Sequence, residues 1–583
     1  MDLMKAKFLL ENLLDRVETV EDGSKQLSGK LTNYELQALQ IALTLFDLPK
    51  PQGLPTISTV ASPQISELPD FKQSMVEVVL EVKDQILTFT DSDADNIELD
   101  VSVFDLPKPP INTRLCLDFG TAMSKAALVE DDDNDYEEIK VLKLGIPGDQ
   151  EEISEVMLVS SVFIDDDGLL WFGKSAVEVA KNQPEDSNRQ QLDNIKRYLS
   201  EEGLNVRVSD MFNPTDIDIT YGDLILSYLM YLTWCVNHAL EFLDGDYPRN
   251  IERRFAMPCL SDPAALEAEQ RLRKYLGEAQ VLADTFFVTL KDGIPLKKFM
   301  AAVHQIRAEK RDYLFVTEKI SEPLGVAGSL LGPQTKTDML AMVVDVGAGT
   351  TDFSLYRIKV NPERDINTAF EVQNTACCLT EAGNYLDKLL KNTIIKETGI
   401  ESDHPSWINI NWYLEKNIRH QKETLFNEKE VFVKIPELDS EVVINRSDFL
   451  NLPQVRAFSE NLKFKMIEIM EGISPDFTKW ILENPARRLV IVLTGGGASL
   501  PMVKELAQGT ISVHGLQVPL APAKSFPAWL EEEHAGLEDD YSRIAVALGG
   551  ARKKIIQSDG TMSIISRGGT SRPTLGTDFT SSR

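Results

Sequence analysis

Leu340-Ala-Met-Val-Val-Asp-Val-Gly-Ala-Gly-Thr-Thr-Asp-Phe-Ser-Leu-Tyr-Arg357 is the stretch of this 583-residue chain that decides its fold. Mostly apolar residues lead into Asp345, a Gly-Ala-Gly-Thr-Thr turn follows, and apolar residues resume after Asp352. This pattern predicts a buried strand, a tight turn and a second strand. Gly347 and Gly349 carry no Cβ and tolerate a positive φ, so the backbone N–H groups of the turn can converge on an anion. The alternative for this turn on its own is an ordinary glycine-rich hairpin.

A second hairpin of the same kind is predicted from Arg114-Leu-Cys-Leu-Asp-Phe-Gly-Thr-Ala-Met-Ser-Lys-Ala-Ala-Leu-Val129. Here too a short apolar strand ends in an aspartate, Asp118, before a Gly-Thr turn and a returning β-like run. A carboxylate beside a phosphate group requires a cation between them, because the two negative charges repel each other. The two hairpins therefore predict two similar half-domains that face one phosphate group, and Asp118 and Asp345 are the aspartates that they supply.

A third glycine-rich turn follows another apolar strand, in Leu489-Val-Ile-Val-Leu-Thr-Gly-Gly-Gly-Ala-Ser-Leu-Pro-Met-Val-Lys-Glu-Leu506. Pro501 is typical of the first turn of a helix. The three glycines Gly495, Gly496 and Gly497 would let a flat ring or a sugar rest against the backbone near the start of that helix.

These three stretches, in this order, resemble the first phosphate, second phosphate and adenosine motifs of the actin-like ATPase superfamily. Within it, the two aspartate-containing turns are most similar to those of the Hsp70 chaperones. Shorter stretches match in the Hsp70 order as well, so that the resemblance covers residues 113–556. They are Phe255-Ala-Met-Pro258, Ser321-Glu-Pro-Leu-Gly-Val-Ala-Gly-Ser-Leu-Leu331, Ala382-Gly-Asn-Tyr-Leu-Asp387 and Ala545-Val-Ala-Leu-Gly-Gly-Ala551.

The resemblance implies an α/β fold of the two-lobed actin-like type, with duplicated ribonuclease-H-like lobes around a nucleotide cleft. Lobe I would cover residues 113–325 and lobe II residues 340–556. Residues 1–112 would form a small helical or mixed N-terminal extension, with a Pro/Ser/Gly-rich linker around residues 49–69. Residues 557–583 are rich in Ser, Thr and Gly and are expected to be a disordered tail.

The resemblance also implies that ATP or ADP binds with Mg²⁺. Asp118 and Asp345 would hold the Mg²⁺ through water molecules, because Mg²⁺ gives up its hydration shell reluctantly. Glu322 and Asp352 would position the attacking water. The residues expected to bind the nucleotide are Gly120, Thr121, Ala122, Gly347, Ala348, Gly349, Thr350, Thr351, Lys422, Gly495, Gly496 and Gly497.

The catalytic lysine of Hsp70 has no clear counterpart in this sequence. Aligned on Gly173, its position falls near Val177, with Lys174 and Lys181 one helical turn to either side. Lys174 is the candidate taken here. Either the alignment slips by a turn, or hydrolysis is slow or absent, because this lysine stabilises charge on the transferred phosphoryl group.

A second departure concerns the helix expected to hold the adenosine. Lys422 matches a lysine of the family, but Glu423 stands where arginine is usual and Arg419 where glutamate is usual. The exchange of charges leaves both the nucleotide affinity and the base preference open. The alternative is that this helix is an ordinary amphipathic helix with a solvated face.

Composition limits the other functions that the chain could have. A net charge of −31 argues against a nucleic-acid or anionic-membrane surface. The five cysteines show no C-x-x-C spacing, which indicates neither a zinc site nor a disulfide framework and favours a cytoplasmic setting. The uncharged run over residues 224–240 is short for a membrane span and is expected to be a buried helix.

The first 112 residues contain a repeated hexapeptide: Phe46-Asp-Leu-Pro-Lys-Pro51 recurs as Phe104-Asp-Leu-Pro-Lys-Pro109. Both copies close an apolar run, which is consistent with proline-enforced turns that arose by internal duplication. The functional alternative is a pair of docking segments. Elsewhere in this region, residues 3–20 and 33–46 have the helical spacing of apolar residues.

The expected function is that of an ATP-hydrolysing, Hsp70-like conformational switch or chaperone-like factor that acts on other proteins. Those partners could be contacted through residues 1–112, and the client-peptide domain of Hsp70 is not expected. The alternatives are a pseudo-ATPase scaffold that binds nucleotide without turnover, a filament-forming actin-like ATPase, and a small-molecule kinase of the same superfamily.

Overall fold

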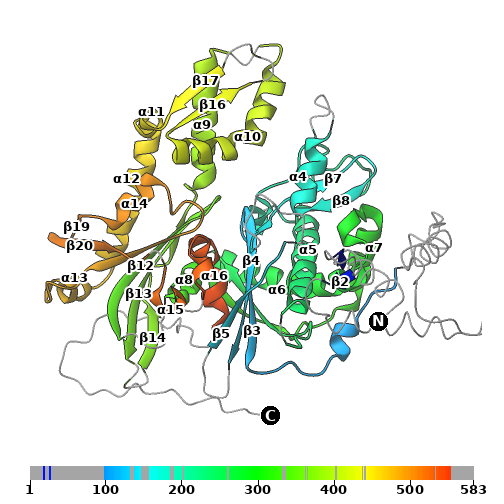
Figure 1. Ribbon diagram of the computed structural model, residues 1–583, viewed down its shortest axis with the longest axis horizontal. Coiled ribbons are helices and arrows are strands. Elements are labelled where there is room, and N and C mark those ends of the chain that lie inside the picture. Colours follow the sequence, from blue (N-terminus) through cyan, green and yellow to red (C-terminus); the bar gives the residue numbers. More distant parts are fainter. Residues whose placement is uncertain are drawn as a thin grey trace, which may run out of the picture.

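The computed structural model describes residues 17–19, 25–27 and 97–552 of the chain, the last range with short gaps. The gaps are residues 132–136, 146–155, 184–188, 200–202, 244, 259–261, 331–335, 362, 364–365, 401–403, 436–437, 439–440, 525 and 532–533. The described part is an α/β structure, as expected, and contains two large sheets side by side (Figure 1).

The first sheet contains β3 (Thr113–Asp118), β4 (Met123–Asp131), β5 (Glu137–Val141), β9 (Glu252–Met257) and β11 (Val316–Ser321), in the order β11-β9-β3-β4-β5. β3, β4 and β5 form an antiparallel meander, because short connections join them. β9 and β11 follow longer helical connections and run parallel to β3. β3 is buried along its whole length, which explains its apolar sequence.

The second sheet contains β12 (Thr337–Val346), β13 (Thr351–Asn361), β14 (Ile366–Glu371), β18 (Leu489–Thr494) and β20 (Leu516–Pro522). Its order is β14-β13-β12-β18-β20. β12, β13 and β14 form an antiparallel meander, and β18 and β20 add parallel strands on the other side of β12. The two sheets therefore have the same strand order and the same strand directions.

Short strands extend both sheets and form separate ones. β6 (Leu158–Val159) pairs with β4, β15 (Cys377–Leu379) pairs with β13, and β19 (Thr510–Val513) pairs with β20. The remaining described strands form one three-stranded and two two-stranded sheets. They are β7 (Val162–Ile164), β8 (Leu169–Phe172) and β10 (Ile294–Pro295), then β16 (Glu430–Lys434) with β17 (Glu441–Asn445), and β1 (Val17–Thr19) with β2 (Lys25–Leu27).

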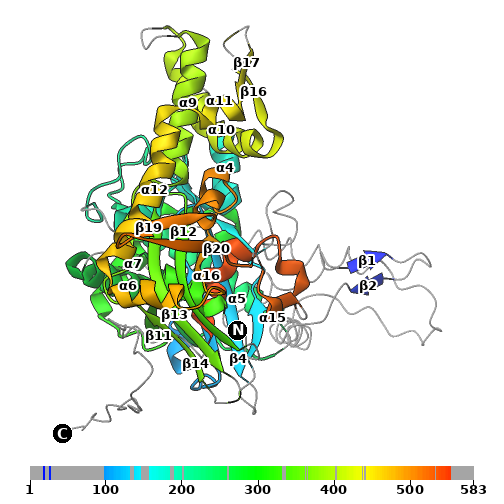
Figure 2. The same ribbon diagram turned by 90° about the vertical axis from the view of Figure 1, so that its left-hand side faces the viewer.

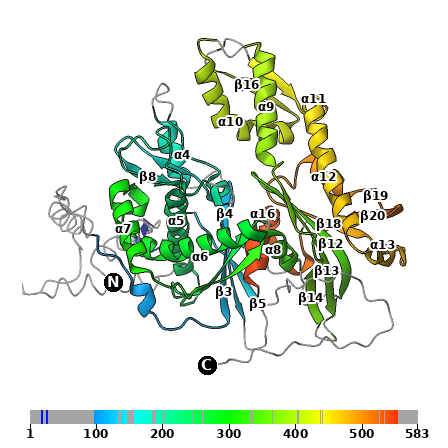
Figure 3. The ribbon, with the colours of Figure 1, turned by 180° about the vertical axis from the view of Figure 1, so that it is seen from behind.

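Two helices, α8 (Glu322–Ser329) and α16 (Tyr541–Ala551), lie between the two sheets (Figures 1 and 3). They cross closely: a Cβ added to Gly549 would overlap the carbonyl oxygen of Gly325. One hydrophobic core surrounds this crossing and takes residues from both sheets, for example Ala127 of β4 and Val343 of β12. The crossing helices therefore join the two sheets into one packed structure.

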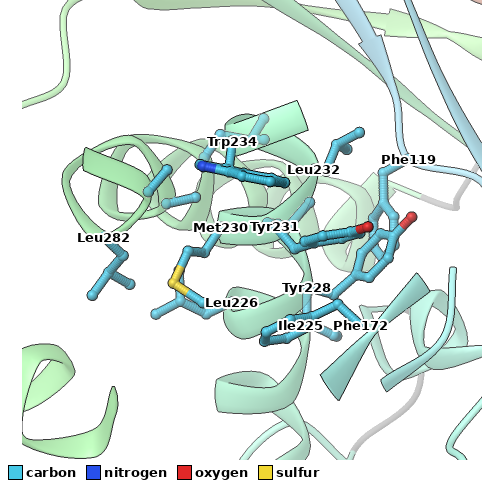
Figure 4. Packing of buried hydrophobic residues seen from close by; sticks show 14 of the residues in the cluster. Phe119, Phe172, Ile225, Leu226, Tyr228, Met230, Tyr231, Leu232, Trp234 and Leu282 are labelled. Carbon is cyan, nitrogen blue, oxygen red and sulfur yellow. The ribbon is translucent and has the colours of Figure 1, made fainter. Parts of the chain in front are cut away.

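The helices that follow the first hairpin are α4 (Gly173–Lys181), α5 (Tyr221–Glu241), α6 (Asp262–Thr285) and α7 (Leu296–Glu309). α5 and α6 pack against each other and share a core with β3 and β4, whereas α4 packs on β7 and β8, and α7 packs on α6 and β10 (Figure 3). α5 is the apolar run noted above, and it is buried around its whole circumference. Its aromatic side chains Tyr228, Tyr231 and Trp234 pack against one another next to Phe119 (Figure 4). In the described part of the chain, no helix has the length and apolarity that crossing a membrane requires.

Helices also flank the second sheet, and Figure 2 shows α9, α10 and the β16–β17 hairpin extending beyond its upper end. The helices of this part are α9 (Gly383–Thr398), α10 (Trp407–Glu428), α11 (Arg446–Leu450), α12 (Pro453–Gly472), α13 (Pro475–Leu482), α14 (Pro501–Lys504) and α15 (Ala528–Glu531). The described 3₁₀ turns of the chain are η2 (Ser102–Asp105), η4 (Ile195–Leu199), η5 (Leu290–Asp292), η7 (Glu505–Ala507) and η8 (Ala535–Leu537).

The N-terminal region departs from expectation in one place. Helical spacing predicted a helix over residues 3–20, but Val17–Thr19 is a strand paired antiparallel with Lys25–Leu27. Its β-branched residues and the Asp22-Gly23 dipeptide between the strands favour a hairpin. The other predictions for this region lie outside the described residues: residues 3–16, the helical segment at 33–46, the first hexapeptide and the linker at 49–69. The tail at 557–583 lies outside them as well.

Candidate functional site

A cavity of about 390 Å³ opens where the carboxyl ends of strands from both sheets come together. Asp118 ends β3, Glu322 follows β11, Asp345 lies near the end of β12, and Gly495 follows β18; all four residues line the cavity. The carboxyl ends of parallel strands are the usual place for ligands in open α/β sheets, because a crevice forms there where the strand order reverses.

The tips of the two predicted hairpins meet at this cavity. A Cβ added to Gly349, in the β12–β13 turn, would lie 3.3 Å from Cγ2 of Thr121 in the β3–β4 turn. The first turn is held by the Ser160 N–H, which donates to the Ala122 carbonyl at 2.9 Å. The second turn closes on itself, with the Gly347 N–H donating to the Thr350 carbonyl at 2.9 Å. Two turns separated by more than two hundred residues thus form one wall.

Acidic side chains gather beneath these tips. Asp118 and Asp345 are buried, with 4% and 7% of their surface exposed. Burial raises the pKa of Asp345 well above its usual range, and the Glu322, Asp352 and Asp118 carboxylates raise it further, while Lys125 opposes them. Lys125 lies 3.2 Å from Asp118. A cation placed among these carboxylates would relieve their mutual repulsion.

Lys196 is the buried lysine of the cavity, and sequence reasoning missed it. Its Nζ lies 2.5 Å from Oε1 of Glu322. Burial lowers its pKa, but the Glu322, Asp118 and Asp352 carboxylates outweigh burial and raise the pKa above its usual value, so the ammonium stays charged. Lys174, the candidate from sequence, does not line the cavity; it lies on α4, 3.8 Å from Glu178.

Lys196 follows Asn194, a residue with a left-handed backbone (φ 58°). Asn tolerates this conformation better than most residues, and it turns the chain into η4, so that Lys196 faces the cavity. A Cβ on Gly349 would lie 3.4 Å from Oδ1 of Asn194, so this turn also reaches the second hairpin. The available signal in the sequence was the Asp193-Asn194 dipeptide before an apolar and basic run.

The second turn also contains residues that support the cavity from behind. Thr351 and Asp352 are buried and, like Gly349, do not line it. The Thr350 hydroxyl donates to Oδ2 of Asp352 at 3.0 Å, and the Thr351 hydroxyl donates to the Glu381 carbonyl at 2.7 Å. Thr350 does line the cavity. Asp352 therefore acts on the cavity through Thr350 and through its charge.

The three glycines after β18 form the opposite wall. Gly495 has a φ of 80°, and a Cβ there would overlap Oδ1 of Asp345, so glycine is required for this close approach. The Gly497 N–H donates to the Val346 carbonyl at 2.9 Å, which fastens this turn to the end of β12. On its other side, the Gly495 N–H donates to the Ser542 carbonyl at 2.8 Å, just inside α16.

α10 supplies a further wall. Lys422 contacts Asp387 of α9 at 2.8 Å and donates to the Gly383 carbonyl at 3.1 Å. Arg419 and Glu423 line the cavity on either side of Lys422, and among the described ion pairs none joins them to each other. The ionisable residues that line the cavity are the basic Lys125, Lys196, Arg419, Lys422 and Arg543 and the acidic Asp118, Glu322, Asp345 and Glu423.

The predicted nucleotide residues are thus brought together with few exceptions. Those that line the cavity are Gly120, Thr121, Ala122, Gly347, Ala348, Thr350, Lys422, Gly495, Gly496 and Gly497. Within the described part of the chain, no group of three or more His, Cys, Asp or Glu side chains is arranged to hold a metal ion by itself. Comparison of the chain with models of protein families and with curated proteins gives no match.

Proposed function

We propose that this chain binds ATP with Mg²⁺ in the cavity, hydrolyses it, and acts as a nucleotide-driven conformational switch for partner proteins. The observation that carries this proposal is the meeting of two aspartate-tipped hairpins, one from each sheet, at a single cavity. A site built in this way would bind the phosphate groups of one ligand from two sides.

The repeated sheet architecture supports the assignment to the actin-like and Hsp70-like ATPases. Each sheet has an antiparallel meander of three strands with two parallel strands beside its first strand. That is the arrangement expected of duplicated ribonuclease-H-like lobes. In this proposal the first sheet with its helices forms lobe I, the second forms lobe II, and the nucleotide lies between them.

The charges around the cavity favour an anionic ligand. Five basic and four acidic side chains line it, whereas the chain as a whole carries a net charge of −31. The surplus of positive charge is therefore local. The turns at residues 120–122 and 347–350 would add backbone N–H groups, which bind phosphate without a side-chain charge.

The carboxylates fit a magnesium ion that keeps most of its waters. Mg²⁺ is commonly held in phosphate sites by one or two carboxylates together with substrate phosphates, not by an all-protein cage. Asp118 and Asp345 would hold it, and it would favour the ionised form of Asp345 that burial disfavours. When bound, the ion would neutralise charge that develops on the transferred phosphoryl group.

Lys196 and Glu322 give the site its catalytic side chains in this proposal. The Lys196 ammonium remains charged and lies beside both hairpins, where it would stabilise negative charge on the phosphoryl group. Glu322, held by Lys196, would accept a hydrogen bond from the attacking water and orient it. The pseudo-ATPase alternative rested on the apparent absence of a catalytic lysine from the sequence. Lys196 supplies a lysine at the cavity, and its presence favours hydrolysis over that alternative.

The switch would operate through α8 and α16. Glu322 begins α8, and the Ser542 carbonyl of α16 holds the Gly495 turn, so both helices touch the cavity and cross between the sheets. Loss of the terminal phosphate would remove contacts to both hairpins at once. The angle between the sheets would then change, and a partner protein could recognise that change.

The test is phosphate release from ATP by the full chain, with and without Mg²⁺, measured beside Asp345→Ala. We expect Mg²⁺-dependent release that the substitution abolishes, together with loss of Mg²⁺-dependent ATP binding in calorimetry. Nucleotide binding without any release would support the scaffold alternative, and ATP-dependent light scattering would support a filament. Absence of nucleotide binding by the unmodified chain would overturn the proposal.

A further inference from the structure

The second copy of the hexapeptide is a docked segment. Val103, just before it, is 1% exposed and belongs to the core of the first sheet and its helices. The Phe104 ring lies 6.0 Å from the ring of Tyr313 and 6.4 Å from that of Phe315, and the guanidinium of Arg311 lies 5.1 Å from its centroid. Phe104 is thus held between aromatic and cationic side chains that precede β11.

Polar contacts fix the backbone of the same segment. The Asn250 side chain donates to the Pro107 carbonyl at 2.8 Å, and Arg249 donates to the Ser102 hydroxyl at 3.0 Å. The Asp100 N–H donates to the Thr285 hydroxyl at 3.0 Å. We call the set that holds residues 99–109 the docking surface. It consists of Arg249, Asn250, Thr285, Arg311, Tyr313 and Phe315.

The similarity between the two copies extends beyond the hexapeptide. Ile41-Ala-Leu-Thr-Leu45 precedes the first copy, and Leu99-Asp-Val-Ser-Val103 precedes the second. Every position at which the second copy meets the docking surface or the core is matched in kind. Leu99 corresponds to Ile41, Val103 to Leu45, Phe104 to Phe46 and Leu106 to Leu48, and the hydroxyl of Ser102 is matched by Thr44.

We propose that the docking surface is a binding site for peptides of this pattern, and that residues 41–51 of the same chain are its second ligand. The two segments cannot occupy the surface together, so they would exchange. This inference stands independently of nucleotide binding, because none of the residues of the docking surface lines the cavity.

Two differences make residues 99–109 the preferred occupant. Val103 is almost fully buried, and Leu45 would place an additional methylene in a packed position. Asp100 accepts the Ser102 N–H at 3.0 Å, and Ala42 has no group that could do so. Residues 41–51 would therefore occupy the docking surface in a minor fraction of the molecules. Substitutions within residues 41–51 can raise or lower that fraction while residues 99–109 stay unchanged.

Exchange within one chain is favoured over docking onto a second copy. Residues 52–98 connect the two segments in the sequence, and a flexible linker of that many residues would span on the order of 40 Å. Such a tether gives an effective concentration on the order of millimolar, far above that of a second copy at ordinary protein concentrations.

Photo-crosslinking in the full chain tests the proposal. The photoreactive residue p-benzoylphenylalanine replaces Phe46, and mass spectrometry identifies the crosslinked peptides. We expect a minor crosslink to residues 311–315 within the same chain. Replacement of Phe104 by the same residue is the positive control, and replacement of Phe71, outside both copies, is the negative control.

Variants of the first copy make the test quantitative without altering the docked segment. Leu45→Val, which imitates Val103, should raise the Phe46 crosslink by about tenfold. Leu45→Glu should abolish it, because the carboxylate would be buried without a partner. A Phe46 crosslink to 311–315 no stronger than that of Phe71, or one unchanged by both variants, would overturn the proposal. A crosslink found only between two chains would overturn exchange within one chain.

Discussion

Nζ of Lys196 and Oε1 of Glu322 lie 2.5 Å apart and join residues that are 126 positions apart in the sequence. The pair connects η4 to the first residue of α8, and α8 crosses α16 between the two sheets. Both side chains line the cavity. The contact therefore connects the wall of the cavity with the helix through which the two sheets pack together.

Replacing Lys196 by methionine should lower the rate of phosphate release by about 10²-fold, the usual effect of removing one preorganised donor. The substitution keeps the length of the side chain and removes its charge, so nucleotide binding should weaken less than turnover does. Single-turnover phosphate release and calorimetry measure the two effects separately.

Lys174→Met is the matched control, because Lys174 was the candidate from sequence and lies outside the cavity. It should leave the rate within a factor of about two, as expected for a surface substitution. A large loss of activity in Lys174→Met combined with an active Lys196→Met would reverse the assignment of the two lysines.

Asp345→Asn should stabilise the nucleotide-free chain at neutral pH. Burial and the neighbouring carboxylates raise the pKa of Asp345, so the folded state binds its proton more tightly than the unfolded state does. Stability due to this group is therefore present at pH values below the unfolded pKa, and it is lost as the pH rises towards the raised folded pKa. Asparagine does not ionise, so the variant does not lose this stability as the pH rises.

Thermal unfolding in the absence of Mg²⁺ and nucleotide measures this effect. The melting temperature of Asp345→Asn should exceed that of the unmodified chain by about 2 °C or more at pH 8, and the difference should shrink near pH 4. Asp338→Asn is a suitable control, since Asp338 is a half-exposed partner of Arg357. A difference that is independent of pH would exclude Asp345 as the titrating group.

Much of the fold could be predicted from local sequence. Residues 340–344 and Leu115–Leu117 are apolar runs that lead into a glycine-containing turn, the pattern that predicts a buried strand and a hairpin. The strand over Val17–Thr19 could not be separated from a helix, because a few apolar residues fit both periods. The crossing of α8 and α16 depends on contacts between Gly325 and Gly549, which no local pattern contains.

For the site, too, local features could be predicted from the sequence and contacts between distant segments could not. The glycine turns could be predicted because a close backbone approach calls for glycine, and their aspartates because each ends an apolar run just before such a turn. Lys196 could not be predicted from the sequence. A lysine is buried only where a partner compensates its charge, and its partner Glu322 lies in a distant segment of the chain. Thr351 and Asp352 were predicted at the site, yet neither lines the cavity, because the Thr351 hydroxyl donates to the Glu381 carbonyl and Asp352 accepts a hydrogen bond from Thr350.

Tyr228→Phe should weaken nucleotide binding without unfolding the protein. The Tyr228 hydroxyl is buried on α5 and lies 3.0 Å from Oγ of Ser124 and 3.2 Å from Oγ of Ser160, and these two hydroxyls are 3.0 Å apart (Figure 4 shows the ring beside Phe119). Ser160 in turn holds the first turn through the Ala122 carbonyl.

The loss of this hydroxyl should cost about 1 kcal/mol of unfolding free energy, since the two serines can still bond to each other. A looser first turn should raise the Kd for Mg·ADP several-fold. Tyr413→Phe is the control and should change neither quantity, because Tyr413 lies partly buried at the edge of the core between the second sheet and its helices. An unchanged Kd in Tyr228→Phe would show that the hydroxyl cluster contributes to stability alone.

Gly549→Ala should destabilise the whole chain, because the added methyl group would overlap the Gly325 carbonyl and force α8 and α16 apart. Overpacking in a core commonly costs about 1–3 kcal/mol, and a clash with backbone belongs at the upper end because no side chain can move aside.

Gly472→Ala, where a Cβ would meet nothing within 4 Å, is the matched control. It should be neutral or stabilising by up to about 1 kcal/mol, since alanine restricts the unfolded chain. Chemical denaturation of both variants measures the difference. If the two helices join the sheets as described, Gly549→Ala should also lower the cooperativity of unfolding, and a single transition with the unmodified midpoint would contradict the crossing.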